Sequence, residues 1–342
     1  MPSPLMPARR RLVLLGTGGT IAGRAASAHD NVGYRVGELG VEELLRGVVV
    51  APALPIEAEQ LAQLDSKDMD HACWQRLAQR LAHHLARPEV QGIVVTHGTD
   101  TLEETAWLLQ RLLAPARPVV LTAAMRPATS LQADGPQNLC DALTVAACTE
   151  AAGVLIVLAG RVLAAGDVRK QHTRRLDAFD GGDAGALAVV EDGRLRRWRD
   201  WPRTQPLGLA CLPRAGTDWP WVEIVVSHAG ARAQAVDAVV GAGARGLVVA
   251  GTGNATVHEA LLPALERAQH AGVAVRLVSR CAAGPVLPGP EHRWPVYATL
   301  SAPQARVELM LELMAGSAHA AGEASAAAAA AGDEAAGGRQ GG

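Results

Sequence analysis

The chain has 342 residues, of which 49% are apolar and 19% charged, and its formal net charge is -2. This composition predicts a globular protein of about two domains. The sequence has no basic stripe and no apolar run of about 18 residues, which argues against a nucleic-acid partner and against a membrane-spanning segment.

The cysteines and the first residues bear on the cellular compartment. The five cysteines are scattered and odd in number, and they form no CxxC pair. This pattern favours a reducing compartment over a disulfide framework or a zinc site. The basic residues near the start precede only the apolar run "LVLL", which is shorter than the apolar core of a signal peptide. We therefore expect a cytoplasmic protein.

In the first half of the chain, short apolar runs alternate with amphipathic segments. The expected buried strands are residues 11–15, 92–97, 118–124 and 153–160. The expected helices are residues 70–87, 101–114 and 136–150. Strand and helix in alternation predict an α/β fold, with a larger N-terminal domain over residues 1–191. Its doubly wound, mostly parallel sheet would be covered by helices on both faces.

The alternation stops at residues 192–220, which are rich in Pro, Gly, Arg and Trp and are expected to be a linker. A second, shorter alternation follows and is closed by a helix over 302–316. It predicts a smaller C-terminal α/β domain over residues 221–316. The Ala- and Gly-rich residues 317–342 have no apolar face to bury, and we expect them to be a disordered tail.

Ligands of open α/β sheets bind beyond the carboxyl ends of the strands, so the residues that follow each strand are informative. The first strand is followed by "GTGGTIAG", in which glycines flank Thr17 and Thr20. The glycines let the backbone approach a ligand closely. On its own, this segment is equally consistent with a structural turn and with a loop that carries a nucleophile.

The second buried strand is followed by "THGTDTLEETA". Asp100 or Thr101 can cap the next helix, and Glu104 suits its first turn. A cap does not account for His97, Thr99 and Asp100 in series. Polar residues in such a run, at the end of a buried strand, are more typical of a site than of a cap.

Three further segments contain candidate residues. Arg126, Asp134 and Asn138 follow the third strand, and we expect them to organise their loop without touching substrate. "LDSKDMD" contributes Ser66 with Asp68, and "NVGYRVG" contributes Tyr34.

Lysine is rare in this chain, where arginine supplies nearly all of the positive charge. The only lysines are Lys67 and Lys170, the latter in "GDVRKQH". A desolvated lysine can lose its proton, whereas a guanidinium stays charged, so a site for a base explains why arginine is absent at 170. Leftover lysines of a biased composition remain an alternative.

Together these residues indicate covalent catalysis by a threonine. A threonine hydroxyl becomes nucleophilic when a neighbouring base takes its proton, and a lysine beside an Asp is a plausible base. Glycine turns can offer backbone amides to the carbonyl oxygen. The histidines His83, His84 and His97 have no zinc-site spacing.

The segments "TGGTIAG", "THGTDTLEETA", "AMRPATSLQADGPQNL" and "GDVRKQHT" resemble the bacterial-type L-asparaginase family, including its glutaminase-asparaginase branch. The resemblance covers about residues 12–314. It implies hydrolysis of a side-chain amide to an acid and ammonia through a covalent acyl-enzyme, without a cofactor. By position, Thr20 matches the nucleophile and Tyr34 the tyrosine that assists it. Thr99, Lys170 and Asp100 match a second set that activates water or acyl transfer.

The resemblance also implies a substrate-binding set and an assembly. Ser66 and Asp100 match groups that hold the α-carboxylate and the α-amine of the substrate. The family forms homotetramers, dimers of dimers, in which the C-terminal domain of a neighbour completes each site. The matching stretch here is "GTGNAT", with Asn254 and with Thr256 where a second asparagine is common. Glu291 is the candidate for the glutamate that crosses to the neighbour's amine.

The sequence therefore predicts an amidohydrolase of a small amino-acid amide, L-asparagine. A glutaminase-asparaginase is the alternative within the enzyme class, because one methylene changes binding by only about 1–3 kcal/mol. A non-catalytic amino-acid-binding module is the alternative from another class, although a binder needs no nucleophile. A nucleotide-binding protein is disfavoured because neither a clean GxGxxG nor a Walker lysine is present.

Overall fold

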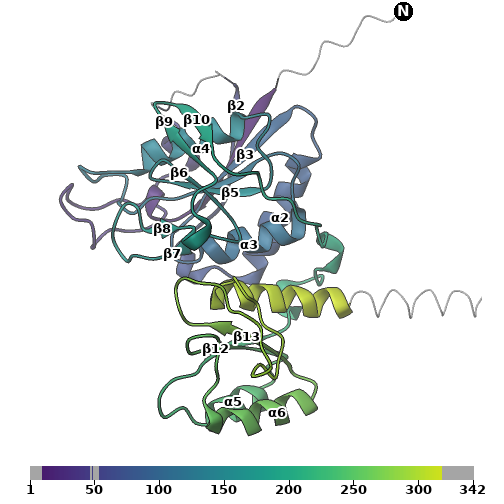
Figure 1. Cartoon of the computed structure of the whole chain (residues 1–342). Coiled ribbons are helices and arrows are strands. Elements are labelled where there is room, and N and C mark those ends of the chain that lie inside the picture. The colour runs from purple at the N-terminus through teal and green to yellow at the C-terminus, as the bar shows by residue number, and fades with distance from the viewer. Residues whose placement is uncertain (1–9, 47, 49–53, 318–342) are drawn as a thin grey trace, which may run out of the picture.

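The computed structural model describes residues 10–46, 48 and 54–317. Its larger unit is built on an eight-stranded sheet with the strand order β10-β9-β6-β5-β4-β3-β1-β2 (Figure 1). The strands are β1 (Arg11–Gly18), β2 (Ile56–Leu64), β3 (Val90–Thr96), β4 (Val119–Thr122), β5 (Val154–Leu158), β6 (Arg161–Ala164), β9 (Ala188–Glu191) and β10 (Arg194–Arg197).

The centre of this sheet is parallel, which confirms the expected fold class. β1 pairs in parallel with β2 and β3, and β3, β4 and β5 continue the parallel order. The strands expected from apolar runs are β1, β3, β4 and β5, and β3 to β5 are buried throughout. Burial on both faces explains their continuous Val, Ile and Leu runs. The strands that sequence analysis missed lie toward the edges, and β6, β9 and β10 are antiparallel.

Helices cover both faces of the sheet. Val13 and Leu15 of β1 pack in one core cluster with α2 (His71–Leu85) and α3 (Leu102–Leu113). Leu12 and Leu14 pack in a second cluster with α4 (Gly135–Ala147) and Val41 of α1 (Val41–Leu44). This alternation follows from the two-residue period of a strand. The expected helices therefore lie close to their predicted positions.

The segment expected as a linker is only partly one. Its first residues form β10, which pairs antiparallel with β9 at the edge of the large sheet. Beyond β10, residues 198–220, all of which are described, contain as helix or strand only the 3-10 turns η4 (Leu209–Cys211) and η5 (Gly216–Asp218). They run along α3, with the amide of Leu207 donating to the carbonyl of Arg111.

The C-terminal unit contains a three-stranded parallel sheet, β11-β12-β13. Its elements are β11 (Val222–Val226), α5 (Gln234–Gly241), β12 (Gly246–Gly251), η6 (Glu259–Leu261), α6 (Leu262–His270) and β13 (Ala274–Ser279). A helix over 302–317 follows and lies between the two units (Figure 1). Its apolar residues belong to the core cluster of α2 and α3, so it joins the units instead of only closing the smaller one.

Two further expectations from the sequence concern the C-terminal tail and membrane-spanning segments. Ser317, placed at the start of the tail, is still helical, while residues 318–342 lie outside the described residues. Among the helices that are described, none is both long and apolar enough to cross a membrane.

Candidate active site

A cavity of about 230 Å³ opens where the central strands of the large sheet end. It brings together the six N-terminal residues predicted for catalysis and binding: Thr20, Tyr34, Ser66, Thr99, Asp100 and Lys170. Also along its wall are residues that sequence analysis did not assign to substrate: Asn31, Val32, Val36, Asp65, Gly98, Ala124, Met125, Arg126, Thr173 and Arg174. The segments after β1, β3 and β4 all reach it, as the carboxyl-end rule predicts.

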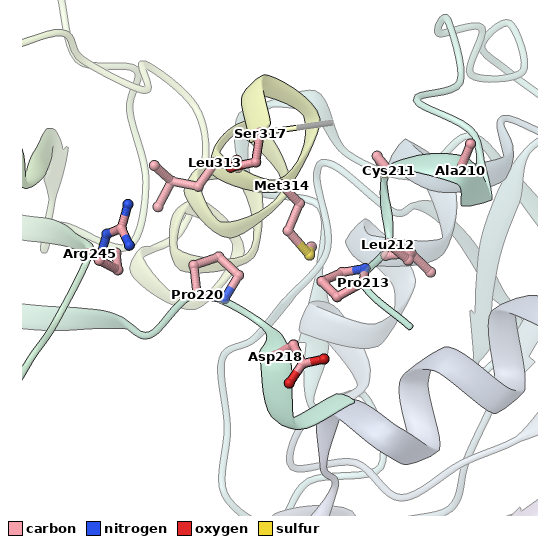
Figure 2. A pocket seen from close by; sticks show the side chains of 10 residues that line it. All are labelled: Ala210, Cys211, Leu212, Pro213, Asp218, Pro220, Arg245, Leu313, Met314 and Ser317. Carbon is pink, nitrogen blue, oxygen red and sulfur yellow. Dashed lines mark hydrogen bonds between the residues drawn. The ribbon is translucent and has the colours of Figure 1, made fainter. Parts of the chain in front are cut away.

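A larger pocket of about 390 Å³ lies elsewhere, between the linker and the end of the 302–317 helix (Figure 2). Its wall is formed by Ala210, Cys211, Leu212, Pro213, Asp218, Pro220, Arg245, Leu313, Met314 and Ser317. This pocket has no lysine and no threonine. The larger pocket is therefore not the better candidate, and we place the candidate active site in the smaller cavity.

Thr20 begins η1 (Thr20–Ala22), directly after β1. The preceding glycines have positive φ, 105° at Gly18 and 84° at Gly19. A Cβ on Gly19 would lie 2.5 Å from the amide nitrogen of Gly98, so this turn passes against the next one with no room for a side chain. The Thr20 hydroxyl lies 2.8 Å from the Tyr34 hydroxyl. The expected pair is formed.

Lys170 lies on β7 (Arg169–Lys170), which pairs with β8 (Phe179–Asp180). Its Nζ donates to Thr99 Oγ1 at 2.9 Å and to Asp100 Oδ1 at 2.7 Å. The lysine side chain is 22% exposed, compared with 51% for Asp100. The predicted threonine, lysine and acid are therefore one hydrogen-bonded set at the cavity wall.

Ser66 connects this set to η2 (Ser66–Asp68). Its hydroxyl, in a residue only 1% exposed, accepts a hydrogen bond of 3.1 Å from the amide of Asp100. The Thr101 hydroxyl donates to the carbonyl of Ser66 at 2.8 Å. Thr101 occupies the N-cap position of α3 but makes no side-chain capping bond, so the predicted cap is wrong in mechanism. Its hydroxyl instead ties two loops of the site together.

His97 lies behind the cavity and does not line it. Its ring Nδ1 is 2.7 Å from the Gly98 carbonyl, and Nε2 is 3.1 Å from the Thr105 hydroxyl. A carbonyl oxygen can only accept, so Nδ1 carries the ring proton and Nε2 of the neutral ring accepts from the Thr105 hydroxyl. Trp74 Nε1 donates to the same hydroxyl at 2.8 Å. Complete burial lowers the pKa of His97 to about 4, which keeps the ring neutral. His97 therefore supports the turn that carries Thr99.

The loop after β4 is organised as predicted. The Asp134 carboxylate accepts from the amides of Met125 and Arg126 at 3.0 and 2.9 Å. Asn138 donates to Asp134 at 3.1 Å and to the Ala123 carbonyl at 2.9 Å. Arg126 also forms part of the cavity wall, however, although we expected it to organise the loop without touching substrate.

Asn254, Thr256 and Glu291 lie in the C-terminal unit and do not reach this cavity in the described part of the chain. Asn254 Nδ2 donates to the Leu287 carbonyl at 2.9 Å and to Glu291 Oε1 at 3.2 Å. The Thr256 hydroxyl lies 2.9 Å from that of Thr252. Of the residues expected to complete a neighbour's site, Asn254 and Glu291 therefore form an exposed pair, while the exposed Thr256 pairs with Thr252.

The described residues include no candidate site for a metal ion. No group of three or more His, Cys, Asp or Glu side chains within this part of the chain is arranged to hold an ion. The polar side chains that line the cavity carry hydroxyls, an amine, carboxylates, guanidinium groups and an amide.

Comparison with known protein families matches both units. The asparaginase N-terminal domain matches residues 11–202, and the glutaminase/asparaginase C-terminal domain matches residues 221–324. The first match ends at residue 202, within the expected linker, and the second begins at residue 221, directly after it.

Individual relatives agree with this. L-asparaginase 2 of Bacillus subtilis is 35% identical over 82% of this chain and 75% of its own length. L-asparaginase 2 of Escherichia coli is 34% identical over 88% of this chain and 88% of its own length. The glutaminase-asparaginase of Pseudomonas fluorescens is 32% identical over 88% of this chain and 86% of its own length.

A solved structure titled as a probable cytoplasmic L-asparaginase from Campylobacter jejuni superposes with a TM-score of 0.83 at 34% identity, covering 89% of this chain and 95% of that one. Two matched domains, relatives matched over 82–88% of this chain and a shared fold all indicate the same family. The chain belongs to the asparaginase family.

Proposed function

We propose that this chain hydrolyses L-asparagine to L-aspartate and ammonia through an acyl-enzyme on Thr20. The observation that carries the proposal is the joint presence, in one cavity, of the Thr20–Tyr34 pair and the Thr99–Lys170–Asp100 set. An amino-acid-binding module has no use for two activated hydroxyls and a lysine. Relatives that carry the name L-asparaginase support the same reaction.

In the first half-reaction, the Thr20 oxygen attacks the side-chain carbonyl carbon of the substrate as its proton leaves toward Tyr34, 2.8 Å away. Tyr34 passes its own phenolic proton to the amide nitrogen in exchange, the C–N bond breaks, and the nitrogen departs as ammonia. In the second half-reaction, water attacks the ester carbon while the Thr99 and Lys170 pair accepts its proton. The C–O bond to Thr20 breaks, and the proton taken from water is returned to the Thr20 oxygen, which restores its hydroxyl.

The substrate's α-groups have suitable partners in the same cavity. Asp100 is half exposed, and its second oxygen can accept from an α-ammonium while Oδ1 holds Lys170. The Ser66 hydroxyl can donate to an α-carboxylate. The basic residues Arg126 and Arg174 on the cavity wall add positive charge on the side that would attract this carboxylate.

Thr20→Ala tests the proposed function. The variant should bind amino acid but release no ammonia, because no oxygen is left to form the ester, whereas Thr20→Ser should keep measurable turnover. Ammonia release from L-asparagine and L-glutamine is measured side by side for the three proteins. Undiminished turnover by Thr20→Ala would remove Thr20 from the reaction. A folded wild-type protein with no turnover on either amide would favour the binding module.

Activity on L-glutamine is the second candidate function, and one relative is named a glutaminase-asparaginase. The two amides differ by one methylene, which is worth only about 1–3 kcal/mol of discrimination. The ratio of the two kcat/KM values in the same assay therefore decides between the branches.

We further propose a cytoplasmic homotetramer in which Asn254, Thr256 and Glu291 of one chain face the cavity of another. Their separation from the cavity of their own chain supports this arrangement. For the compartment, the described cysteines Cys73, Cys148, Cys211 and Cys281 form no disulfide. One structural relative is titled cytoplasmic, but one sequence relative is named periplasmic. We propose no cofactor and no nucleic-acid or membrane partner.

A further inference from the structure

The segment that carries Lys170 has little regular structure of its own. β7 contains only Arg169 and Lys170, and it pairs only with the equally short β8. A ribbon of this size is not stable by itself. Contacts from other elements must therefore fix the backbone of Lys170, and they determine whether Nζ reaches Thr99 and Asp100.

The first source of such contacts is the start of the 302–317 helix, which has the capping-box sequence "SAPQ". The Ser301 hydroxyl accepts from the amide of Gln304 at 3.3 Å, and Gln304 Oε1 accepts from the amide of Ser301 at 3.0 Å. This reciprocal pair satisfies two backbone donors at the helix start. Gln304 is completely buried, so its remaining N–H groups need partners inside the protein.

Those partners lie in the turn that leads to Lys170. Gln304 Nε2 donates to the carbonyl of Ala165 at 3.0 Å and to that of Val168 at 3.1 Å. The same side chain therefore caps the C-terminal helix and fixes the segment immediately before β7.

The Ser301 hydroxyl completes the connection. It donates to Glu103 Oε1 at 3.2 Å, and Glu103 Oε2 accepts from the backbone amide of Lys170 at 2.9 Å. Glu103 lies on the first turn of α3, just after Thr99 and Asp100 in the chain. The lysine backbone and the two groups that its amine contacts are thus tied to one cluster.

A further anchor comes from the C-terminal unit. The guanidinium of Arg169, the residue before Lys170, donates to the carbonyls of Ala282 and Thr299 at 2.6 Å each. The residue next to Lys170 is therefore hydrogen-bonded to loops of the C-terminal unit.

We infer that Gln304, Ser301 and Glu103 are positioning residues that hold Lys170 within reach of Thr99 and Asp100. The inference rests on the proposed function, in which Lys170 handles a proton, and extends it to residues far along the chain. Nζ lies 2.9 and 2.7 Å from its two partners, and a backbone shift of about 1 Å would break these bonds. Misplacement of that size can cost about 100-fold in rate.

Gln304→Met tests the inference, because methionine keeps the buried volume but removes the amide. We expect kcat on L-asparagine to fall about 10- to 100-fold with little change in KM. The matched control is Gln75→Met. Gln75 is also buried, and its Nε2 donates to two backbone carbonyls, those of Pro213 at 2.9 Å and Arg214 at 3.2 Å. Gln75→Met should lower the Tm about as much as Gln304→Met does and leave kcat unchanged.

A second readout does not depend on activity. The chain has only two lysines, so labelling lysine with ¹³C at Cε gives two NMR signals, which Lys67→Arg assigns. Gln304→Met should move the Lys170 signal and leave the Lys67 signal in place, whereas Gln75→Met should move neither. Unchanged kcat together with an unmoved Lys170 signal would overturn the inference.

Two other results call for separate readouts: a variant that does not fold, and a wild-type protein without activity. If Gln304→Met does not fold, Ser301→Ala takes its place, since it removes only the hydroxyl between Glu103 and Gln304. It should lower kcat several-fold and move the Lys170 signal in the same direction, and failure of both effects overturns the inference. If the wild-type protein releases no ammonia, the proposed function fails, while the lysine signals still decide whether the cluster holds Lys170.

Discussion

At the scale of single residues, the two lysines of the chain have opposite surroundings. Lys67 is 60% exposed and pairs with the carboxylates of Asp65 and Asp68. An exposed pair of this kind contributes little and would accept arginine. Lys170 is mostly buried, and one of its two partners is a hydroxyl. A hydroxyl does not need a fixed positive charge, but it can exchange a proton with an amine.

Lys170→Arg should lower kcat at least about 100-fold, because a guanidinium can donate to Thr99 but cannot take up its proton. Ammonia release from L-asparagine measures this loss, and the Tm checks that the variant is folded. Lys67→Arg is the matched control and should retain wild-type kcat. Activity of Lys170→Arg within a few-fold of wild type would exclude Lys170 from the proton path.

At the scale of elements, the first turn of α3 combines two partly buried acids with different partners. Glu103 accepts from Lys170 and Ser301, while Glu104 lies 3.5 Å from Arg306 of the 302–317 helix. Burial raises the pKa of Glu104 to about 7, because the attraction of Arg306 does not offset the loss of water and Glu103 adds repulsion. The contact between these helices therefore contains a carboxyl that titrates near neutrality.

This pKa fixes the sign of a pH effect on stability. The protonated carboxyl of Glu104 stabilises the folded state fully below about pH 4.5, and that contribution is lost as the pH rises through about 7. Glu104→Gln mimics the neutral form and should therefore raise the free energy of unfolding at pH 8, by at most about 3 kcal/mol.

Urea unfolding of the wild type and of Glu104→Gln at pH 5 and pH 8 measures the effect. The gain should be larger at pH 8 than at pH 5. A gain that is equal at both pH values, or a loss at pH 8, would contradict the buried-acid interpretation.

At the scale of the whole molecule, the 302–317 helix binds the two units together. Glu308, which is 8% exposed, accepts two bonds from Arg111 Nε and Nη2 of α3 at 2.8 and 2.9 Å, and one from Trp107 Nε1 at 3.0 Å. Bonds to a charged group in a buried setting are the stronger kind. The larger unit, which contains the candidate active site, is thus bound to the last helix of the described chain.

The proposed assembly makes a prediction about subunit mixing. Glu291→Gln removes the charge expected to bind a substrate amine in the neighbour's cavity, which should raise KM about 10- to 100-fold. Mixing it with Thr20→Ala should create some sites with Thr20 from one chain and Glu291 from another. After subunit exchange, activity at low L-asparagine concentration should exceed that of both parents.

The control for mixing is the double variant Thr20→Ala/Glu291→Gln, which cannot supply either group and should restore nothing. Light scattering should give four times the 35.5 kDa of one chain. A monomer, or mixtures whose activity equals the average of the parents, would contradict a shared site.

The sequence by itself determined the secondary elements of the core and the segments that carry the site. Periodicity is a local property, so continuous apolar runs identified β3, β4 and β5, and helical spacing identified α2 and α3. Parallel strands end at one edge of the sheet, so the polar loops after them could be assigned to one site before any distance was known. The polar alternation of β2 hid that strand.

Only the tertiary structure decided which side chains meet. Lys170 and Thr99 are 71 positions apart, and their bond depends on how β7 is held against α3. Thr101 was expected to cap a helix but binds Ser66, and Gln304 connects the 302–317 helix to the segment before Lys170. A side chain has several possible partners within its reach, and its neighbours along the chain do not choose among them. Packing of the completed fold does, because it alone determines which buried donors and acceptors face each other.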